Sequence, residues 1–235
     1  MVTVLEAGVW WLDLPGTNAY LVDDGGTLTL VDTGLPWTAR TVERAVERVS
    51  GGRGAGPAAA IDRVLLTHTD FDHVGGLSRI AGLDAPVVVG EADAPSLRGD
   101  ERPPWNRPKG LLQRATEWWR SPPDLPIRTV ADGDEIGSFT AYHTPGHTPG
   151  HTAFVSESLS VGAVGDLVYT TDGRLELPPR YLAYDHGAAR RSLRGFAERT
   201  ADFELTCHGH GTPVASGGAG AIRAAAARTG DDARG

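Results

Sequence analysis

The chain has 235 residues, of which 40% are apolar and 22% are charged, and this balance excludes wholesale disorder. Its formal net charge is -8, with 30 acidic against 22 basic residues, so most of its surface would repel nucleic acid. Cys207 is the only cysteine, and no stretch approaches the ~20 apolar residues of a membrane span. Because no basic residue precedes Arg40 to mark a signal peptide, we expect a soluble, cytoplasmic protein that binds neither nucleic acid nor membrane.

Short strands and helices follow one another along the first half of the chain. Apolar patterns predict strands at residues 2–5, 8–12, 19–22, 27–31, 61–67 and 86–89. A tight turn at residues 24–26 joins two of them into a hairpin. Helices are expected from a Thr38 cap through Val49 and over residues 74–80, where Gly75 and Gly76 let the turn pack closely.

Residues 97–126 break this rhythm and are expected to form an insertion on the outside of the core fold. The segment holds six prolines around a helical stretch at residues 111–120. Its tryptophans Trp105, Trp118 and Trp119 offer large apolar surfaces. We expect them either to cover the active-site edge and help select the substrate, or to anchor the insertion to the core.

The second half resumes the alternation of strands and helices. Strands are predicted at residues 127–130, 139–143, 152–155, 160–164 and 203–206. Helices are predicted at residues 188–199 and 219–228, before a frayed tail at 230–235. Strands with intervening helices in both halves indicate one layered α/β domain over residues 1–235.

Histidines and aspartates gather where predicted strands end. His68, Asp70, Asp72 and His73 stand within six residues, directly after a buried strand. Residues two apart in an extended loop point the same way, so His68 and Asp70 are expected to meet one metal ion, with Asp72 and His73 facing a second direction. The alternative is a polar loop in which Asp72 caps the following helix and the histidines are solvated.

Three further segments supply the same residue types. His147 stands in a rigid Pro/Gly loop, Asp166 ends a strand, and His210 follows the last strand in the run His-Gly-His-Gly. Ligands at the ends of separate strands converge on one edge of a sheet sandwich, as a metal site requires.

In order, the motifs Thr-His-Thr-Asp-Phe-Asp-His-Val-Gly-Gly, Thr-Pro-Gly-His-Thr, Gly-Asp and Gly-His-Gly resemble those of the metallo-β-lactamase-fold hydrolase superfamily. The resemblance extends to Gly211 and implies an αββα sandwich with a binuclear metal site at one edge. It assigns the ligands residue by residue: His68, Asp70 and His147 for the first ion, Asp72, His73 and His210 for the second, and Asp166 as the bridge. It also implies that Asp32 orients a ligand histidine, although a plain strand-ending turn residue is the alternative.

The family motif has a histidine at the position of Asp70. With Asp70, Asp72, Asp166 and a hydroxide all anionic, two divalent ions would be about neutral overall. Oxygen-rich sites favour iron or manganese more than an all-imidazole site does. Zinc is our first choice for the two ions, with iron or manganese as alternatives, and Asp70→His is expected to shift the preference toward zinc.

The remaining histidines and the cysteine are expected to be structural. His143 and His151 are interpreted as hydrogen-bonded neighbours of the site, and His186 as a capping or packing residue. Cys207 is interpreted as a small buried residue. Asp166 occupies the point where β-lactamases of this fold have their ligand cysteine, so the resemblance does not extend to β-lactamase activity.

Two metal ions activate water without a Ser or Cys nucleophile, and the sequence has neither a Gly-x-Ser-x-Gly elbow nor a P-loop. We therefore expect a hydrolase of small-molecule esters, thioesters or lactones, with Asp72 and Tyr169 as catalytic residues. Tyr169 follows the bridging Asp166 by three positions, and lactonases that resemble this chain use such a tyrosine to reach the substrate carbonyl. The alternative is that the ring of Tyr169 packs under the metal loop.

Other functions stay open on the same fold. They are a mononuclear iron oxidoreductase resembling persulfide dioxygenases, a phosphodiesterase, and a metal-binding module without catalysis. Glyoxalase-II-like thioesterases carry a C-terminal helical domain, tRNA-processing nucleases an RNA-binding arm, and diiron oxygen reductases a flavodoxin domain. None of these additions is expected from the composition and length of this chain.

Overall fold

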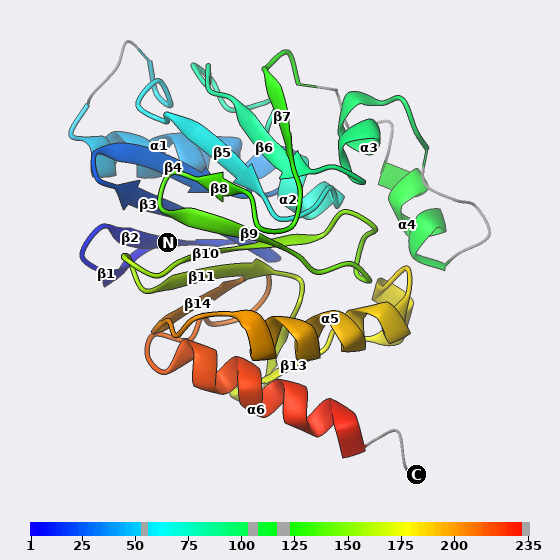
Figure 1. Cartoon of the computed structure of the whole chain (residues 1–235). Helices are drawn as coiled ribbons and strands as arrows, with labels where there is room; N and C mark the ends of the chain where they lie inside the picture. The colour runs from blue at the N-terminus through cyan, green and yellow to red at the C-terminus, as the bar shows by residue number, and fades with distance from the viewer. Residues whose placement is uncertain (53–55, 103–107, 117–122, 232–235) are drawn as a thin grey trace.

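The computed structural model describes residues 1–52, 56–102, 108–116 and 123–231, and it has four layers (Figure 1). Two β-sheets pack face to face, and helices cover the outer face of each sheet. This arrangement confirms the predicted αββα sandwich.

The first sheet has seven strands that lie in sequence order. They are β1 (Val2–Glu6), β2 (Val9–Leu14), β3 (Thr17–Asp24), β4 (Thr27–Val31), β5 (Arg63–Leu66), β6 (Val87–Gly90) and β7 (Ile127–Val130). The strands β1 to β4 pair antiparallel, whereas β4 to β7 pair parallel. Parallel strands end at the same edge of a sheet, so the residues that follow β4, β5 and β6 are brought together.

The second sheet has five strands in the order β14, β11, β10, β9, β8. Their bounds are Leu205–His208, Val161–Gly165, Thr152–Ser156, Phe139–His143 and Glu135–Ile136. Here β11 and β14 are parallel, and the other neighbours are antiparallel. A separate hairpin of β12 (Tyr169–Thr171) and β13 (Arg174–Glu176) follows β11.

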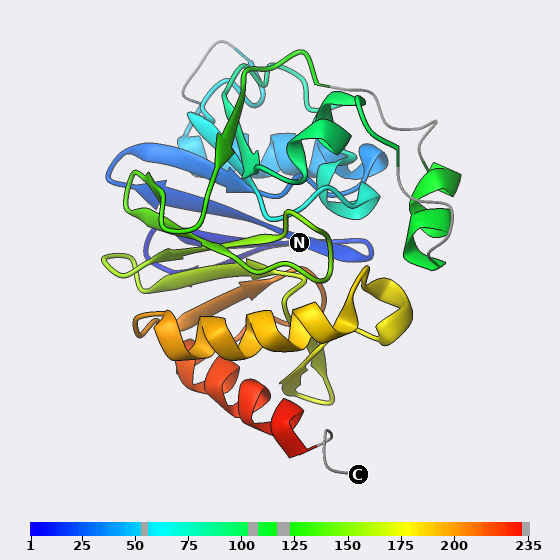
Figure 2. The ribbon, with the colours of Figure 1, turned by 45° about the vertical axis from the view of Figure 1, so that its right-hand side comes forward.

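Helices form the two outer layers and one edge. The helices are α1 (Ala39–Ser50), α2 (Phe71–Val74), α3 (Ala94–Arg98), α4 (Pro108–Thr116), α5 (His186–Arg199) and α6 (Gly218–Asp231). The last two cover the second sheet, and α1 to α3 lie on the side of the first sheet (Figure 2). The helix α4 stands at the edge of the sandwich, in contact with the 3-10 turn Arg180–Leu182.

The core follows the alternation of side chains along each strand. In β5, Leu65 packs between the two sheets, whereas Val64 and Leu66 pack beneath the helices of the first layer. The second sheet contributes Phe139 and Phe154 to the layer between the sheets, and both are fully buried. Burial on both faces explains why Val64, Leu65 and Leu66 form an unbroken apolar run.

The helix predicted over residues 74–80 is wrong, because α2 ends at Val74 and turns follow it. Gly76 lies so close to the loop after β4 that a Cβ atom at Gly76 would be 2.2 Å from the carbonyl oxygen of Thr33. Its backbone N–H donates to the carbonyl of Gly34 at 2.8 Å. This close approach fixes the path of the chain and overrides the helical spacing of the apolar residues.

Several element ends also differ from expectation. Thr38 does not cap α1, because its hydroxyl donates to the Leu35 carbonyl at 2.8 Å within a 3-10 turn. The helix of the insertion begins at Pro108, before the predicted start at residue 111. The helix α6 extends to Asp231, so the start of the predicted tail is helical. Trp105, Trp118 and Trp119 lie outside the described residues.

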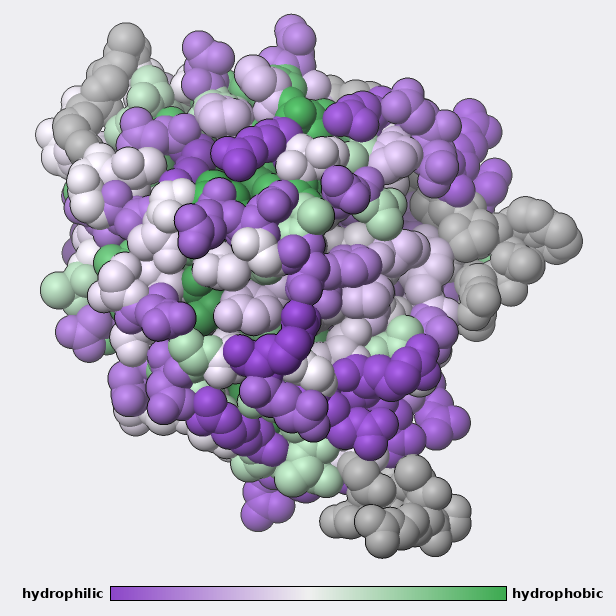
Figure 3. Space-filling model, in the orientation of Figure 1, coloured by the Kyte–Doolittle hydropathy of each residue, from purple (hydrophilic) through white to green (hydrophobic). Residues whose placement is uncertain are grey.

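The surface is mixed in character. On the face drawn in Figure 3, hydrophilic residues gather over the layer of α5 and α6, and apolar residues lie scattered between polar ones. Among the helices of the described ranges, none has the length and apolar character needed to cross a bilayer.

Candidate metal centre

The seven predicted ligands meet at the edge of the sandwich where parallel strands end. They fall into two groups, and within each group the ligand atoms lie within 4.8 Å of one another. The first group is His68, Asp70, His147 and Asp166, and the second is Asp72, His73 and His210. His68 and Asp70 lie in the loop after β5, whereas Asp72 and His73 lie in α2, and the turn of the chain into this helix divides the four residues between the groups.

Asp166 lies between the two groups and is almost completely buried. Its Oδ2 atom is 3.1 Å from Nε2 of His147 and 3.2 Å from Nε2 of His210. Its Oδ1 atom is 3.3 Å from Nε2 of His73. One carboxylate therefore contacts imidazoles of both groups, which is the position that a bridging ligand needs.

The burial of the histidines excludes a solvated polar loop. His68 and His73 are fully buried, and His147 is 3% exposed. The residue before α2 is Asp70, and α2 has no side-chain cap, so Asp72 does not serve that role.

Asp32 anchors one histidine of each group. Its Oδ2 atom is 2.8 Å from Nδ1 of His73 and accepts a hydrogen bond from the hydroxyl of Thr67 at 2.8 Å. The Thr67 oxygen lies 3.0 Å from Nδ1 of His68, which is left to donate because the hydroxyl proton is already used. Both imidazoles thus keep Nε2 toward the centre, as metal ligation requires.

The backbone of Asp32 adopts a left-handed conformation with a φ of 55°. Such a conformation is uncommon for a residue other than glycine and costs of the order of 1 kcal/mol. The backbone N–H of Thr67 donates to Oδ1 of Asp32 at 2.9 Å, which helps hold the side chain in this turn. Asp32 is therefore an orienting residue, as the resemblance implies, rather than only a turn residue.

The carboxylates and imidazoles shift one another's pKa values. Burial alone would raise the pKa of Asp166, but the neighbouring His210, His73 and His147 hold it well below its usual value. Burial would lower the pKa of His73, but the carboxylates of Asp166, Asp32 and Asp72 raise it well above the ordinary range. The carboxylate of Asp166 is thus ionised at neutral pH, the state that metal ligation requires.

The residues present fit a pair of metal ions. Within the described part of the chain, the buried atoms His68 Nε2 and Asp166 Oδ1 have no hydrogen-bond partner, a state that costs about 1–3 kcal/mol per group. His68 Nε2 lies 3.5 Å from Asp70 Oδ2 and 3.8 Å from Asp166 Oδ2, spacings suited to a cation shared between them. Imidazole nitrogens and carboxylate oxygens are ligands for zinc, iron and manganese.

Asp93, which the sequence analysis did not single out, ties the two ligand loops together. Its Oδ2 atom accepts hydrogen bonds from the backbone N–H of Thr69 at 3.2 Å and from the hydroxyl of Thr148 at 2.7 Å. Its Oδ1 atom accepts from the backbone N–H of Gly150 at 2.6 Å. The only signal in the sequence is its place shortly after a predicted strand.

Lys109 was also missed, and it lies against the first group. Its Nζ atom is 2.8 Å from Asp70 Oδ2 and donates to the carbonyl oxygen of His147 at 2.8 Å. The side chain is 2% exposed although it belongs to the insertion. Gln113, one turn further along α4, donates to Asp70 Oδ1. One signal could have found Lys109, because it is the only lysine in the sequence.

A cavity of about 350 Å³ opens beside the two groups. Phe71 and Leu182 form apolar parts of its wall, and Tyr169 lines it next to Asp166. The Tyr169 hydroxyl donates to Asp166 Oδ2 at 2.6 Å. Burial and then the charge of Asp166 raise the pKa of Tyr169, so the phenol stays protonated and can donate.

The other histidines are hydrogen-bonded neighbours, as predicted. His151 contacts Thr144 Oγ1 through Nδ1 at 2.8 Å, and its Nε2 accepts from the backbone N–H of Asp166 at 3.1 Å. His143 lies 3.0 Å from the Pro149 carbonyl. Cys207 is buried, and burial raises the pKa of its thiol, which confirms a packing role.

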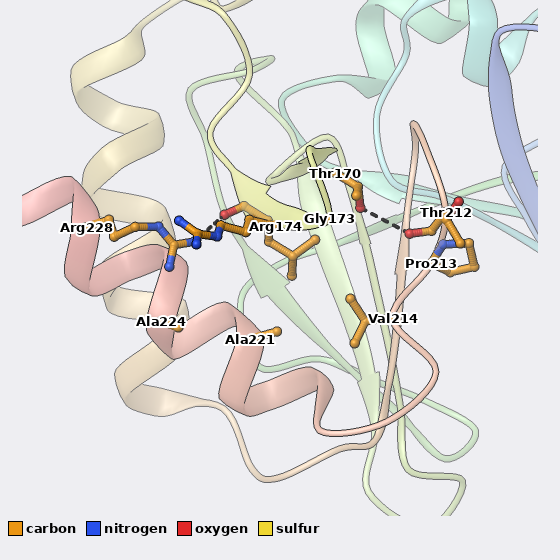
Figure 4. Close-up of a pocket in the computed structure, with 10 residues that line it drawn as sticks. Thr170, Gly173, Arg174, Thr212, Pro213, Val214, Ala221, Ala224 and Arg228 are labelled. Carbon is orange, nitrogen blue, oxygen red and sulfur yellow. Dashed lines mark hydrogen bonds between the residues drawn. The ribbon is translucent and has the colours of Figure 1, made fainter.

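A second cavity of about 350 Å³ lies between the β12–β13 hairpin and α6 (Figure 4). Ten residues line it, and none is a histidine, cysteine or carboxylate: Thr170, Gly173, Arg174, Leu175, Thr212, Pro213, Val214, Ala221, Ala224 and Arg228. Arg228 donates to the Leu175 carbonyl at 2.6 Å, and the Thr170 hydroxyl donates to the Thr212 carbonyl at 3.1 Å. The ligand-type residues are thus concentrated at the first cavity.

Two packed sheets with a cluster of histidines and aspartates at one edge are the arrangement of a metal-binding αββα protein. A sequence profile described as the metallo-beta-lactamase superfamily matches residues 12–208. The chain therefore belongs to the metallo-β-lactamase superfamily.

Three known proteins illustrate the relationship. "Probable metallo-hydrolase YflN" of Bacillus subtilis is 28% identical over 235 residues, covering 91% of this chain and 83% of that protein. "Uncharacterized protein YobT" of the same species is 30% identical over 155 residues, covering 63% of this chain and 60% of that protein's length. The crystal structure of "TTHA1623 in a di-iron-bound form" is 26% identical, with a TM-score of 0.66 over 92% of this chain and 96% of that one.

Proposed function

We propose that the protein is a metal-dependent hydrolase of small-molecule esters, thioesters or lactones. The observation that carries the proposal is the convergence of seven imidazole and carboxylate side chains, with Asp166 at their centre, beside a cavity of about 350 Å³. Membership of the superfamily supports hydrolysis, and the name of the relative YflN, a probable metallo-hydrolase, points the same way.

In this proposal the two groups hold two divalent ions, and Asp166 contributes to both. Ions bound there supply an activated water molecule and polarise the bond that is cleaved. Zinc is our first choice. Iron and manganese are the alternatives, supported by the additional carboxylate of Asp70 and by the di-iron form of TTHA1623.

The chain's own residues bind the substrate and handle protons around this centre. Phe71 and Leu182 would bind apolar parts of the substrate. The side chain of Asp72 is 32% exposed and lines the cavity, so while Oδ2 faces the ligand histidines the other carboxylate oxygen would accept a proton. The Tyr169 hydroxyl has one proton, which it donates to Asp166 in the free protein, and on substrate binding it would turn to donate that hydrogen bond to the substrate carbonyl oxygen instead.

The alternatives differ in what they need from the site. An oxidoreductase with one iron ion needs a single ligand group, so two groups around a shared carboxylate favour the hydrolase. A small-molecule substrate is in keeping with the net charge of -8, which disfavours nucleic acid, and a single cysteine suits a cytoplasmic protein.

The test combines metal removal with a panel of substrates. Protein stripped with a chelator and reloaded with zinc, iron or manganese would be assayed on lactones, thioesters, esters and phosphodiesters. We expect hydrolysis of at least one carbonyl substrate, with turnover lowered by orders of magnitude after verified metal removal. His186→Ala is the matched control, because His186 begins α5 outside both ligand groups and should leave turnover unchanged.

Three results would oppose this proposal. The absence of hydrolysis across the panel with metals fully loaded would favour a non-catalytic module. Hydrolysis that persists in metal-free protein would remove the mechanism. Oxygen consumption on a persulfide by iron-loaded protein, without hydrolysis, would favour the oxidoreductase.

A further inference from the structure

The helix α4 places a single cation against the first ligand group. The ammonium of Lys109 lies 2.8 Å from Asp70 Oδ2, the same oxygen that lies 3.0 Å from Nε2 of His147. It also donates to the His147 carbonyl oxygen at 2.8 Å and lies 5.7 Å from the centre of the Tyr184 ring. Lys109 therefore contacts two residues of the first group directly, from a segment outside the sandwich.

The identity of this cation is unusual for the sequence. The chain has 22 basic residues, and the other 21 are arginines. An ammonium is a compact point charge on an unbranched stem, whereas a guanidinium is a planar fork that needs more room. A lysine used once, at a position 2% exposed beside Asp70, indicates that the site requires a small buried cation.

A network of hydrogen bonds fixes Asp70 from the same helix. Gln113 Nε2 donates to Asp70 Oδ1, while Gln113 Oε1 accepts from the hydroxyl of Tyr184. The Tyr184 contact determines which end of the amide faces Asp70. Both oxygens of Asp70 thus have a donor from α4, and the carboxylate is held in one orientation.

The negative charge of Asp70 explains why a cation lies beside it. The superfamily motif usually has a neutral histidine here, and an aspartate adds one negative charge to the centre. The ammonium of Lys109 contributes one positive charge within hydrogen-bond distance, so the pair as a whole is neutral, like the imidazole it replaces.

We propose that Lys109 is a positioning residue of the metal centre, and that the Asp70–Lys109 pair takes the place of the second histidine of the family motif. The proposal rests on the metal centre of the proposed function. The ammonium orients Asp70 and offsets its charge. Since a cation and a metal ion then share one carboxylate, Lys109 also weakens metal binding at the first group and makes it depend on the insertion.

A double-mutant cycle on metal-free protein tests the pair without substrate or metal. The variants are K109M, D70H and D70H/K109M, with thermal midpoints measured in chelator. With Asp70 present, K109M leaves a buried carboxylate without its cation, and we expect the midpoint to fall by about 3 °C or more. In the D70H background, the same change removes a buried cation that has lost its carboxylate, and we expect the midpoint to rise relative to D70H alone.

The opposite changes in thermal midpoint distinguish a charge pair between Asp70 and Lys109 from a lysine that only anchors α4. R114M is the matched control, because it removes an exposed positive charge from the same helix and should have the same effect in both backgrounds. If K109M lowers the midpoint equally in the parent and in the D70H background, Lys109 only anchors α4, and the proposal is overturned. That result would leave the hydrolase proposal standing, whereas a missing hydrolytic activity would not alter the cycle.

Metal affinity gives the second readout. With a chromophoric chelator as competitor, we expect K109M to bind zinc at the first group about tenfold more tightly or better, because the competing cation is gone. An unchanged or weaker zinc affinity in K109M would overturn the proposal. Unchanged affinity together with a raised KM for anionic substrates alone would instead assign Lys109 to substrate binding.

Discussion

The first and second ligand groups, here called the two halves of the metal centre, are held by different parts of the molecule. In the first half, Asp70 is fixed by Lys109 and Gln113, which α4 brings from the insertion. In the second half, His210 Nδ1 donates to the carbonyl oxygen of Gly16 at 2.9 Å, between β2 and β3 of the first sheet. The same region also holds the residue after His210, since Asn18 Nδ2 donates to the Gly211 carbonyl at 2.7 Å.

The difference separates a fixed half from an adjustable one. In the second half, His210 and the segment after it depend on contacts with residues 16–18 of the first sheet, so this half is tied to the sandwich itself. In the first half, His68 is oriented by Thr67, but Asp70 depends on side chains of a segment outside the sheets, so substitutions in that segment can alter metal affinity while the fold is kept. Asp166 and Asp32 connect the halves, because each contacts or orients residues of both.

The largest effect is expected from Asp166→Asn, which removes the negative charge shared by both halves. We expect both metal affinities to fall and turnover to drop by more than the 10- to 100-fold that is typical for the loss of a partner of a ligand. Metal analysis and steady-state kinetics would measure this. A variant that keeps two ions and at least a tenth of the parent turnover would show that the halves do not share Asp166.

The next pair of variants compares the halves directly. His147→Ala and His210→Ala each remove one ligand, so we expect each protein to lose one ion, keep the other and lose turnover by orders of magnitude. Metal content per chain after dialysis gives the readout. If either substitution empties both sites, the halves are not separable and the comparison fails.

Tyr169→Phe tests the substrate side of the centre, and it keeps the ring while removing the hydroxyl. We expect kcat to fall about a hundredfold for lactones and alkyl esters, since one hydrogen bond to a developing oxyanion is worth about 3 kcal/mol. Phosphodiester hydrolysis should change little. Parent rates on lactones, with an unchanged thermal midpoint, would mean that the tyrosine only packs and holds Asp166.

A smaller effect is expected from Asp32→Asn. An amide has one acceptor oxygen, so it cannot accept from the Thr67 hydroxyl and His73 on one side and from the backbone N–H of Thr67 on the other, and the ligand histidines lose their fixed orientation. We expect metal affinity and turnover to fall about tenfold, the lower end of the range for such partners. Thr67→Val is the comparison, because it disturbs only the branch to His68. Equal losses of both ions in Thr67→Val would contradict the separate branches.

The clustering of ligand-type residues could be predicted from the sequence because it depends on local features, and the resemblance to the family supplied the assignment of each ligand. Strands of apolar residues end directly before His68 and Asp166, and parallel strands bring their ends to one edge whatever the rest of the chain does. The pairing of His68 with Asp70 needed only the alternation of directions along a loop, and the second direction of Asp72 and His73 follows from the turn into α2. The order of strands and helices indicated a layered α/β domain, and the resemblance to the family implied the αββα sandwich.

The parts that could not be predicted depend on contacts between distant segments. Lys109 meets Asp70 only because the insertion folds back over the site, and no periodicity encodes that path. The turns after Val74 replace a helix because Gly76 lies against Thr33, a residue of another loop. The composition marked this position in one way, because Lys109 is the only lysine among 22 basic residues.

The most direct test of the central claim is the number of metal ions that the parent protein needs for hydrolysis. Metal-free protein would be titrated with zinc, and bound metal and turnover on the best substrate would be measured in the same samples. We predict two ions per chain at saturation and turnover that follows occupancy of the centre. Full turnover with one ion per chain, or turnover that does not depend on bound metal, would contradict the account.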